Sequence, residues 1–265
     1  MSKIALAAIG RLENAYAEEW VEHHLSLGFD KVIICDNNRD GEERFEDVLG
    51  ERVREGRVVV RDFRNIEKAQ RPAYTNTYLH YGREYDWLAF FDFDEFLCIH
   101  TSLPQDVHAL MERYGRQFQV VMVPWLTYTD SGLVLNDGRP VRERFTEVNL
   151  SESTAGKAIV RGGITGLRYK PSVHLPGCPV LRCCDTRGRE VPQNRHTEMN
   201  TDVAWLAHYT TKTIEEYLSN KARKGTAGRT YARFLETYGD YFFQVNKRTP
   251  EKEAFIERWN REHGL

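Results

Sequence analysis

The stretch that most constrains the fold is residues 87–97, WLAFFDFDEFL, a short apolar run that ends in three carboxylates. A short apolar run rich in aromatic residues predicts a strand that is buried on both faces. Carboxylates at the end of such a strand are costly to bury unless positive charge compensates them. Because residues i and i+2 of a strand point to the same side, we expect Asp92 and Asp94 to converge on one ion, or on one ion and its ligand. Glu95 would face the other way if the strand continued past Asp94.

Paired carboxylates of this kind suit a hard cation, Mg2+ or Mn2+, whose remaining ligands are phosphate oxygens of a substrate. The alternative interpretation is a loop in which the acids cap a helix or lie in water, since Asp-x-Asp is common by chance. The position of Asp92 and Asp94 at the end of a buried strand favours the metal site.

The composition is that of a globular protein without a broad charged surface. Of the 265 residues, 41% are apolar and 29% are charged, and the net charge is −2. This balance argues against a nucleic-acid partner and leaves room for a local basic pocket for phosphates. The apolar part of the N-terminus is too short for a membrane span and lacks a cleavage region, so we expect a cytoplasmic location, with peripheral membrane association left open. The sequence does not indicate an oligomeric state.

The five cysteines have no framework spacing, which is typical of reduced thiols in a reducing compartment. Cys178, Cys183 and Cys184 lie near His174 and His196 in the sequence, but this spacing matches no standard structural zinc pattern. We therefore do not expect a zinc site.

Strands alternate with helices in the first half of the chain. Strands are predicted over residues 4–9, 31–35, 58–60 and 87–97, and helices over 14–27, 45–49 and 70–85. This order predicts an α/β fold with a mostly parallel sheet flanked by helices. Ligands of such sheets bind beyond the carboxyl ends of the strands, where three polar clusters fall: residues 11–14, 36–38 and 92–95. Asp36 and Asn37 also favour tight turns, so we expect a turn role with an added ligand role.

The second half is less regular. We expect a helix over 105–114, strands over 120–123, 158–160 and 203–209, and helices over 213–224, 231–238 and 251–262. Residues 124–132 combine aromatic and hydroxyl side chains with Asp130, which suits binding of a sugar ring; the alternative is an ordinary turn with Trp125 in the core. The predicted domains are a catalytic domain over 1–212, with a nucleotide-binding half (1–100) and an acceptor half (101–212), and a helical extension over 213–265.

A series of short motifs occurs in a defined order. They are Asn14-x-x-x-Glu18-Glu19-Trp20, His23-His24-x-x-Leu27-Gly28, Cys35-Asp36-Asn37, Gln70-x-x-x-Tyr74, Asp92-Phe-Asp94-Glu95-Phe96-Leu97, Arg144-Phe145, Lys157-x-Ile159-Val160 and His208-Tyr209-x-x-Lys212. Together they resemble the family 2-like and family 92 glycosyltransferases over most of residues 1–225.

The resemblance implies a GT-A fold, a nucleotide-sugar donor (a UDP-sugar by preference), Mn2+ or Mg2+, and transfer of a hexosyl group to a carbohydrate or lipid-linked glycan acceptor. It implies that Asp92 and Asp94 bind the metal with a late histidine, His208 first and His174 second. The residues that it assigns to the donor are Arg11, Glu13, Asp36, Asn37, Gln70, Lys157 and Lys212.

Related families mostly invert the sugar, and inversion in one step needs a carboxylate base on the acceptor hydroxyl. The candidates are Asp130 first, then Glu95 and Glu147. The chain has Thr129-Asp130-Ser131-Gly132 where the resemblance leads us to expect a Gly-Ser-Ser-Gly-like stretch, so the base stays open.

Two other functions remain open at this point. A nucleotidyltransferase also uses carboxylate-held metal, but it usually has a glycine-rich phosphate loop after its first strand, and residues 10–13 offer only Gly10. A non-catalytic carbohydrate-binding protein on the same fold would show no metal-dependent nucleotide binding.

Overall fold

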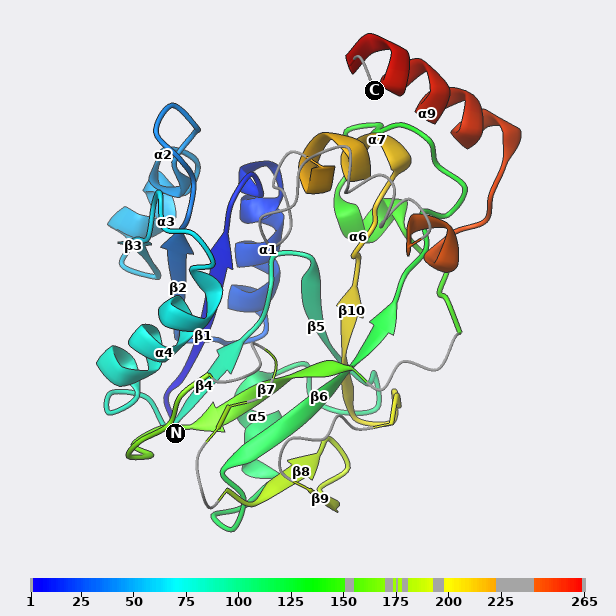
Figure 1. Cartoon of the computed structure of the whole chain (residues 1–265). Helices are drawn as coiled ribbons and strands as arrows, with labels where there is room; N and C mark the ends of the chain where they lie inside the picture. The colour runs from blue at the N-terminus through cyan, green and yellow to red at the C-terminus, as the bar shows by residue number, and fades with distance from the viewer. Residues whose placement is uncertain are drawn as a thin grey trace. The chain divides into compact units, whose positions relative to one another are not determined.

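The computed structural model describes residues 2–150, 155–169, 174, 176–177, 181–192, 198–222 and 241–263 (Figure 1). The chain divides into two compact units. We call Met1–Leu126 with Glu152–Ala207 the sheet unit, and Thr127–Ser151 with His208–Leu265 the C-terminal unit.

Four parallel strands form the first half of the sheet. They are β1 (Ile4–Gly10), β2 (Lys31–Asp36), β3 (Val58–Asp62) and β4 (Trp87–Phe90), in the order β3-β2-β1-β4. The helices between them are α1 (Asn14–Ser26), α2 (Phe45–Val48), α3 (Gly50–Arg54) and α4 (Gln70–Tyr81). Parallel neighbours need such crossover helices, which is why the alternation of the sequence predicts this half well.

Antiparallel pairs dominate the second half. β7 (Gly156–Arg161) pairs antiparallel with both β4 and β6 (Val120–Thr127), and the path continues to β10 (Ala204–His208) and β5 (Glu95–Ile99). The short strands β8 (Cys183–Asp185) and β9 (Glu190–Val191) branch from β6, and α5 (Val107–Glu112) follows β5.

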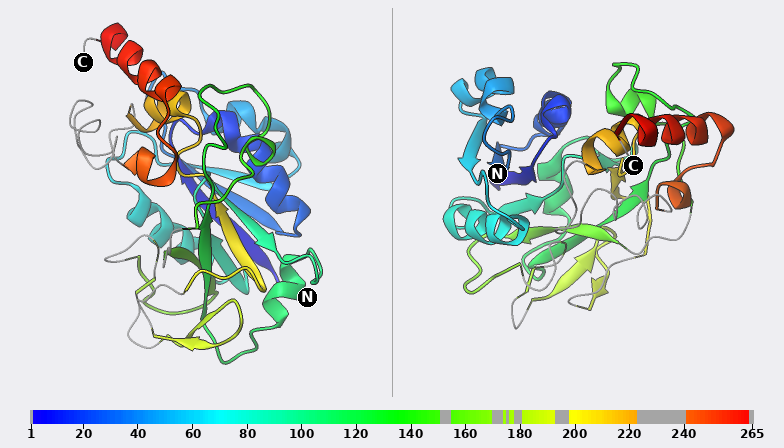
Figure 2. Two further views of the ribbon diagram at one scale, coloured as in Figure 1. Left: turned by 90° about the vertical axis from the view of Figure 1, so that its right-hand side faces the viewer. Right: turned by 45° about the horizontal axis from the view of Figure 1, so that its top comes forward.

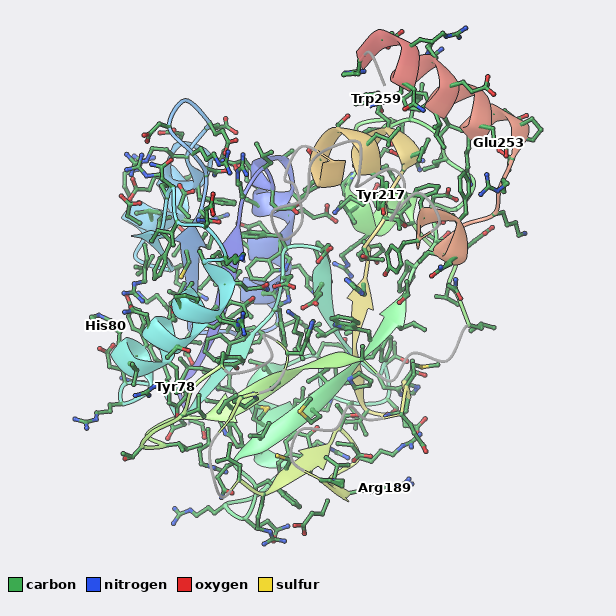
Figure 3. All side chains as sticks on the ribbon, in the orientation of Figure 1. Tyr78, His80, Arg189, Tyr217, Glu253 and Trp259 are labelled. Atoms are coloured by element: carbon green, nitrogen blue, oxygen red, sulfur yellow. The ribbon has the colours of Figure 1, made fainter. Side chains whose placement is uncertain are left out.

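The helices α1 and α4 lie on opposite faces of the parallel strands (Figure 2). Tyr74 and Tyr78 of α4 are buried in one core cluster with Ala5 and Ala7 of β1. The hydroxyl of Tyr78, labelled in Figure 3, donates to the carbonyl of Arg161 at 2.7 Å, which ties α4 to the end of β7. Both faces of the parallel strands are therefore covered, as their near-continuous apolar sequence requires.

The C-terminal unit has a separate small core. Its described helices include α6 (Val141–Arg144), α7 (Ile214–Glu216), the π-helix η1 (Tyr217–Ala222) and α9 (Pro250–His263), and residues 241–245 are also helical. Ile214, Tyr217, Leu218, Phe242 and Phe255 are buried together, and Trp259 packs against them (Figure 3).

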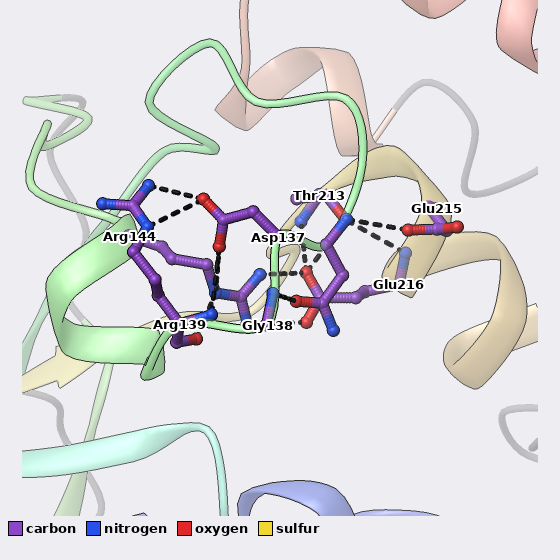
Figure 4. A network of polar contacts seen from close by, with 8 residues as sticks. Asp137, Gly138, Arg139, Arg144, Thr213, Glu215 and Glu216 are labelled. Carbon is purple, nitrogen blue, oxygen red and sulfur yellow. Dashed lines mark hydrogen bonds and ion pairs between the residues drawn. The ribbon is translucent and has the colours of Figure 1, made fainter.

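A polar network fixes the start of α7 within this unit (Figure 4). The guanidinium of Arg144 donates two hydrogen bonds to the carboxylate of Glu216, at 2.8 and 2.9 Å, and both side chains are buried. Thr213 and Glu216 also form a capping box. Paired in this way, the buried charges stabilise the helix start instead of disrupting it.

The α/β class with helices on both faces of the sheet is confirmed, and several element bounds differ from prediction. The helix predicted over 70–85 ends at Tyr81, and the one predicted over 213–224 is a single α-helical turn followed by η1. β8 and β9 were not predicted, the strand predicted over 87–97 is divided between β4 and β5, and the helix predicted over 231–238 lies outside the described residues. The domain boundaries remain a prediction. Among the described helices, none combines the length and the apolar character needed to cross a bilayer.

Candidate active site

The carboxyl ends of neighbouring parallel strands bring the predicted polar clusters to one edge of the sheet unit. Gly10 at the end of β1 pairs with Asp36 at the end of β2, and Ala7 pairs with Phe90 at the end of β4. The N–H of Asn37 donates to the carbonyl of Gly10 at 2.9 Å. The polar residues that follow these strands therefore share one edge, where ligands of such sheets bind.

The stretch 87–97 forms two strands rather than one, because β4 ends at Phe90 and β5 begins at Glu95. The residues between them form a turn, in which the N–H of Glu95 donates to the carbonyl of Asp92 at 3.0 Å and the N–H of Asp92 donates to Glu95 Oε2 at 2.8 Å. The expectation that Asp92 and Asp94 face one side of a continuous strand is wrong, because the chain leaves β4 for a strand that pairs with β10. Turn hydrogen bonds, rather than strand alternation, keep the three acids together.

Aromatic packing anchors this turn from beneath. Phe93 is buried, stacks on Phe45 with ring centroids 4.9 Å apart, and contacts Trp20 at 4.8 Å. A Cβ atom on Gly10 would lie 2.6 Å from ring atoms of both Phe45 and Phe93. Only glycine at the end of β1 therefore lets Phe93 pack this closely.

Three side chains of α1 hold the start of β5. Trp20 Nε1 donates to the carbonyl of Glu95 at 2.8 Å, and His23 Nε2 donates to the carbonyl of Leu97 at 2.7 Å. His24 Nε2 accepts from the N–H of Leu97 at 3.2 Å, while its Nδ1 bonds the carbonyl of Trp20 at 2.8 Å. Since Nε2 accepts, the proton of His24 is on Nδ1 and the buried ring is neutral. The motif around Trp20 thus positions the strand that follows the acidic turn.

Asp92 is held by three donors from two elements. Its Oδ1 accepts from Gln70 Nε2 at 2.8 Å and from the hydroxyl of Tyr74 at 2.7 Å, and its Oδ2 accepts from Lys157 Nζ at 2.7 Å. Gln70 and Tyr74 lie one turn apart on α4, so both reach the same carboxylate. Burial raises the pKa of Tyr74 well above its ordinary value, and the charge of Asp92 raises it further. Tyr74 therefore stays protonated as a donor.

Lys157 and Glu95 are the two fully buried charged groups beside Asp92. Burial lowers the pKa of Lys157, but the charges of Asp92 and Glu95 outweigh burial and raise it, so the ammonium group keeps its charge. Burial raises the pKa of Glu95 well above its ordinary value although Lys157 opposes this. Glu95 Oε1 lies 3.7 Å from Lys157 Nζ and makes no hydrogen bond within the described chain.

The residues of this turn fit a divalent cation. Asp94 is half-buried, and it and Glu95 each offer a carboxylate oxygen within 4.8 Å of the other. Oxygen ligands from carboxylates are those that Mg2+ and Mn2+ prefer. A buried carboxylate oxygen without a partner, such as Oε1 of Glu95, is costly unless a cation or donor reaches it.

The neighbouring loops are tied to protein partners. Arg11 forms a bidentate ion pair with Glu42, with a shortest distance of 2.7 Å, and its hydrogen bond lowers the pKa of Glu42. Asp36 is buried; its Oδ1 accepts from the N–H of Asn38 at 2.9 Å and its Oδ2 from that of Phe45 at 3.2 Å. These bonds show the turn role predicted for Asp36. The donor-binding roles of Arg11 and Asp36 stay predictions.

Three further predicted residues have local contacts in the sheet unit. Asn37 Nδ2 donates to the carbonyl of Phe63 at 2.6 Å, and the carbonyl of Glu13 accepts at 3.0 Å at the start of α1. His174 packs edge-on against Trp125, with ring centroids 5.2 Å apart. Their roles in donor, metal or sugar binding are not decided by these contacts.

Asp130, the first choice for the base, lies at the centre of a buried network in the C-terminal unit. Its Oδ2 is 2.5 Å from Lys252 Nζ, and the side chains are 3% and 1% exposed. Its Oδ1 accepts from the N–H of Gly132 at 2.9 Å, and its own N–H donates to Asn246 Oδ1 at 2.6 Å. This arrangement links the loop after β6 to the start of α9. The role of Asp130 as the base stays a prediction.

The other candidates in this unit differ in exposure. Glu147 is exposed, whereas His208 and Lys212 are buried. His208 is the last residue of β10, and Lys212 has a left-handed backbone with φ of 54°. Their assignments as base, metal ligand and phosphate contact stay predictions.

Sequence reasoning missed two of the residues that organise these networks. Tyr74 belongs to the motif Gln70-x-x-x-Tyr74 but was not among the predicted site residues. Residues four apart on a helix lie on the same face, so this spacing could have indicated that Tyr74 reaches the same site as Gln70. Lys252 carried no signal, because it is one lysine in a charged helix and its partner Asp130 is remote in sequence.

Comparisons with known proteins agree with the resemblance. A family model described as Glycosyltransferase family 92 matches residues 15–158, more than half of the chain. A glycosyltransferase family 92 protein of Ricinus communis is 32% identical over 107 residues, which are 40% of this chain. The chain spans 18% of the length of that relative.

Solved structures give weaker likenesses. Residues 1–349 of TarS from S. aureus match at 13% identity with a TM-score of 0.45, covering 95% of this chain and 77% of that one. The mannosyltransferase PcManGT from Pyrobaculum calidifontis, in complex with GDP-Man and Mn2+, matches at 13% identity with a TM-score of 0.36, covering 46% of this chain and 35% of that one. These likenesses are too low to carry an argument about this site. The family model, which matches more than half of the chain, shows that the chain belongs to glycosyltransferase family 92.

Proposed function

We propose that this protein transfers a hexosyl group from a nucleotide-sugar donor, a UDP-sugar by preference, to a hydroxyl of a glycan acceptor, with Mn2+ or Mg2+ bound at the acidic turn. The observation that carries the proposal is this turn itself, residues 92–95. It places a buried carboxylate oxygen without a hydrogen bond at the edge where β1, β2 and β4 end, in a chain of family 92.

The chain's own contribution is to hold the acidic turn in place before the donor arrives. The bound cation would neutralise charge on the departing nucleoside diphosphate. Gln70, Tyr74 and Lys157 fix Asp92, and the side chains of α1 fix the start of β5, so the carboxylates need little rearrangement on binding. His208, at the end of β10, is the proposed histidine ligand.

For transfer with inversion, a carboxylate must take the proton of the acceptor hydroxyl. Asp130 is enclosed with Lys252, and Glu95 is fully buried, whereas Glu147 is exposed. Because a base has to reach the acceptor, the burial of Asp130 and Glu95 and the exposure of Glu147 favour Glu147 as the proposed base in place of Asp130. A lipid-linked acceptor, a cytoplasmic location and peripheral contact with a membrane rest on the sequence alone.

The test is a panel of UDP-, GDP- and CDP-sugars with and without Mn2+, read by the shift in melting temperature and then by analysis of products. We expect one nucleotide-sugar to stabilise the protein more with Mn2+ than without it, and to release a nucleoside diphosphate. Asp94→Asn is the matched control, which should keep the fold and lose the effect of Mn2+.

The competing functions give different products in the same experiment. A nucleotidyltransferase would release pyrophosphate from a nucleoside triphosphate, and a non-catalytic binder would leave every nucleotide-sugar intact. If no nucleotide-sugar shifts the melting temperature with either Mn2+ or Mg2+, the transferase proposal is wrong.

A further inference from the structure

Asp92 and Glu95 of the turn differ in how many of their oxygens the protein already uses. Both oxygens of Asp92 accept hydrogen bonds, Oδ1 from Gln70 and Tyr74 and Oδ2 from Lys157, all at 2.7 to 2.8 Å. A carboxylate oxygen has two lone-pair directions, so Oδ1 is saturated. The protein itself therefore supplies three hydrogen-bond donors to the carboxylate of Asp92.

The ammonium group of Lys157 occupies the place beside Asp92 that a cation would need. It is fully buried on β7, where the backbone pairing of Lys157 with Val123 of β6 fixes it, and its Nζ lies 2.7 Å from Asp92 Oδ2. A divalent cation bound to Oδ2 would meet this charge at close range in a low-dielectric environment, where repulsion between like charges is strong. Lys157 therefore opposes direct ligation by Asp92.

Glu95 is arranged in the opposite way. Its side chain is fully buried, and its Oε2 accepts from the N–H of Asp92, which sets the direction of the carboxylate. Its Oε1 has no hydrogen bond within the described chain, and Lys157 Nζ is at 3.7 Å, beyond hydrogen-bond distance. Buried polar atoms of native proteins almost always have a partner, so an orphan of this kind indicates a missing one.

Asp94 lies next to Glu95 and completes the pair. Carboxylate oxygens of the two residues lie within 4.8 Å of each other. A cation such as Mg2+, bound about 2.1 Å from each oxygen, bridges oxygens up to about 4.2 Å apart, so little side-chain rotation is needed.

We infer that Asp94 and Glu95 supply the carboxylate ligands of the cation. Asp92, whose carboxylate is paired with Lys157, positions the turn and does not bind the cation. This inference rests on the proposed function for the presence of a cation, and it changes the sequence-based ligand pair Asp92 and Asp94. Asp92 acts through the turn, because its main-chain N–H fixes Glu95 and its side chain fixes the turn to α4 and β7.

The first test replaces each acid by cysteine and titrates the full chain with Cd2+. A thiolate that ligates this soft cation gives a charge-transfer absorption band in the ultraviolet, over a wild-type control that carries the natural cysteines. We expect the band for Asp94→Cys and Glu95→Cys and no band for Asp92→Cys. A band for Asp92→Cys without one for Glu95→Cys overturns the inference, as does the absence of a band in all three folded variants.

The second test measures Mn2+ binding by the electron paramagnetic resonance signal of free Mn2+. The double variant Asp92→Asn/Lys157→Met removes the buried pair without leaving a lone charge. We expect it to bind Mn2+ with a Kd about tenfold weaker than the wild type, the lower end of the loss of about 10–100-fold that is typical of groups acting through a ligand. Glu95→Gln should bind at least about tenfold more weakly than that double variant. Loss of Mn2+ binding in the double variant, together with wild-type binding in Glu95→Gln, refutes the assignment.

These measurements separate the ligand assignment from the transferase proposal. If Mn2+ binds through Asp94 and Glu95 but no nucleotide-sugar binds, the ligand assignment stands and the transferase proposal fails. If a nucleotide-sugar binds and the wild type binds no Mn2+, the ligand assignment fails and a cation-independent transferase remains.

Discussion

Lys252→Met is expected to destabilise the C-terminal unit, because it leaves the carboxylate of Asp130 buried without its counter-charge. The two charged atoms lie 2.5 Å apart, and the side chains are 1% and 3% exposed. At this burial, solvent screens the charges little, so breaking the pair by removing one partner costs about 3–5 kcal/mol. The N–H of Gly132 donates to Asp130 Oδ1 at 2.9 Å. We expect this hydrogen bond to persist in the variant, so the expected loss lies in the lower part of that range.

The assay is urea unfolding followed by circular dichroism, with amide hydrogen exchange at Gly132 as a local readout. Lys247→Met is the matched control, since Lys247 is exposed in the same unit, and such a surface change should stay within about 0.5 kcal/mol. The double variant Asp130→Asn/Lys252→Met removes both charges and should recover much of the loss, because replacing a buried pair together is often close to neutral.

The opposite result would return Asp130 to the candidates for the base. If Lys252→Met unfolds at the wild-type urea concentration and Gly132 keeps its exchange protection, the buried pair does not stabilise the unit and the reasoning fails. A base removed by Asp130→Asn would instead lower kcat by about 10²–10⁴ without a change in the free energy of unfolding.

Three further predictions concern other contacts. Burial raises the pKa of Glu216, but the hydrogen bonds and charge of Arg144 outweigh burial and hold that pKa below its usual 4.5. A carboxyl group whose pKa is lower in the folded state stabilises the fold at pH values above its unfolded-state pKa, and this stabilisation is lost as the pH falls. Urea unfolding of Glu216→Gln should therefore show a weaker decline toward about pH 4 than the wild type, and an equal decline would contradict this. His24→Leu removes the acceptor of the Leu97 N–H, so the free energy of unfolding should fall by about 1–3 kcal/mol; wild-type stability would show that this bond adds nothing. Asp94→Asn should abolish sugar transfer while circular dichroism shows a native fold, and retained turnover would remove Asp94 from the cation.

The order of strands and helices in the first half could be predicted because each signal is local. Apolar runs, turn residues and helical spacing lie within a few residues of each other, and parallel strands force their carboxyl ends to one edge. The location of the acidic turn at that edge, beside Gly10 and Asp36, follows from this order alone. The short strands β8 and β9 were missed because two or three residues carry too little periodic signal.

The partners of the site residues could not be predicted, because they come from distant parts of the chain. Lys157 was expected at the donor, and its partner in the structure is the carboxylate of Asp92, 65 residues away in sequence. The sequence around a lysine in an apolar strand does not indicate which carboxylate will pair with it. Lys157 becomes buried and paired only when β7 is placed beside β4. Asp130 and Lys252 are joined in the same way, by the packing of α9 in its own unit.

The sequence by itself determined the α/β class, the parallel half of the sheet, the presence of acids where β4 ends and the membership of a glycosyltransferase family. Tertiary structure alone decided that residues 87–97 are two strands, that both oxygens of Asp92 accept hydrogen bonds from protein donors, and that Glu95 keeps a buried oxygen without a hydrogen bond within the described chain. The physical reason is that local sequence patterns determine on which strand, helix or turn a residue lies. Its charged partners depend on which remote strands and helices pack around it.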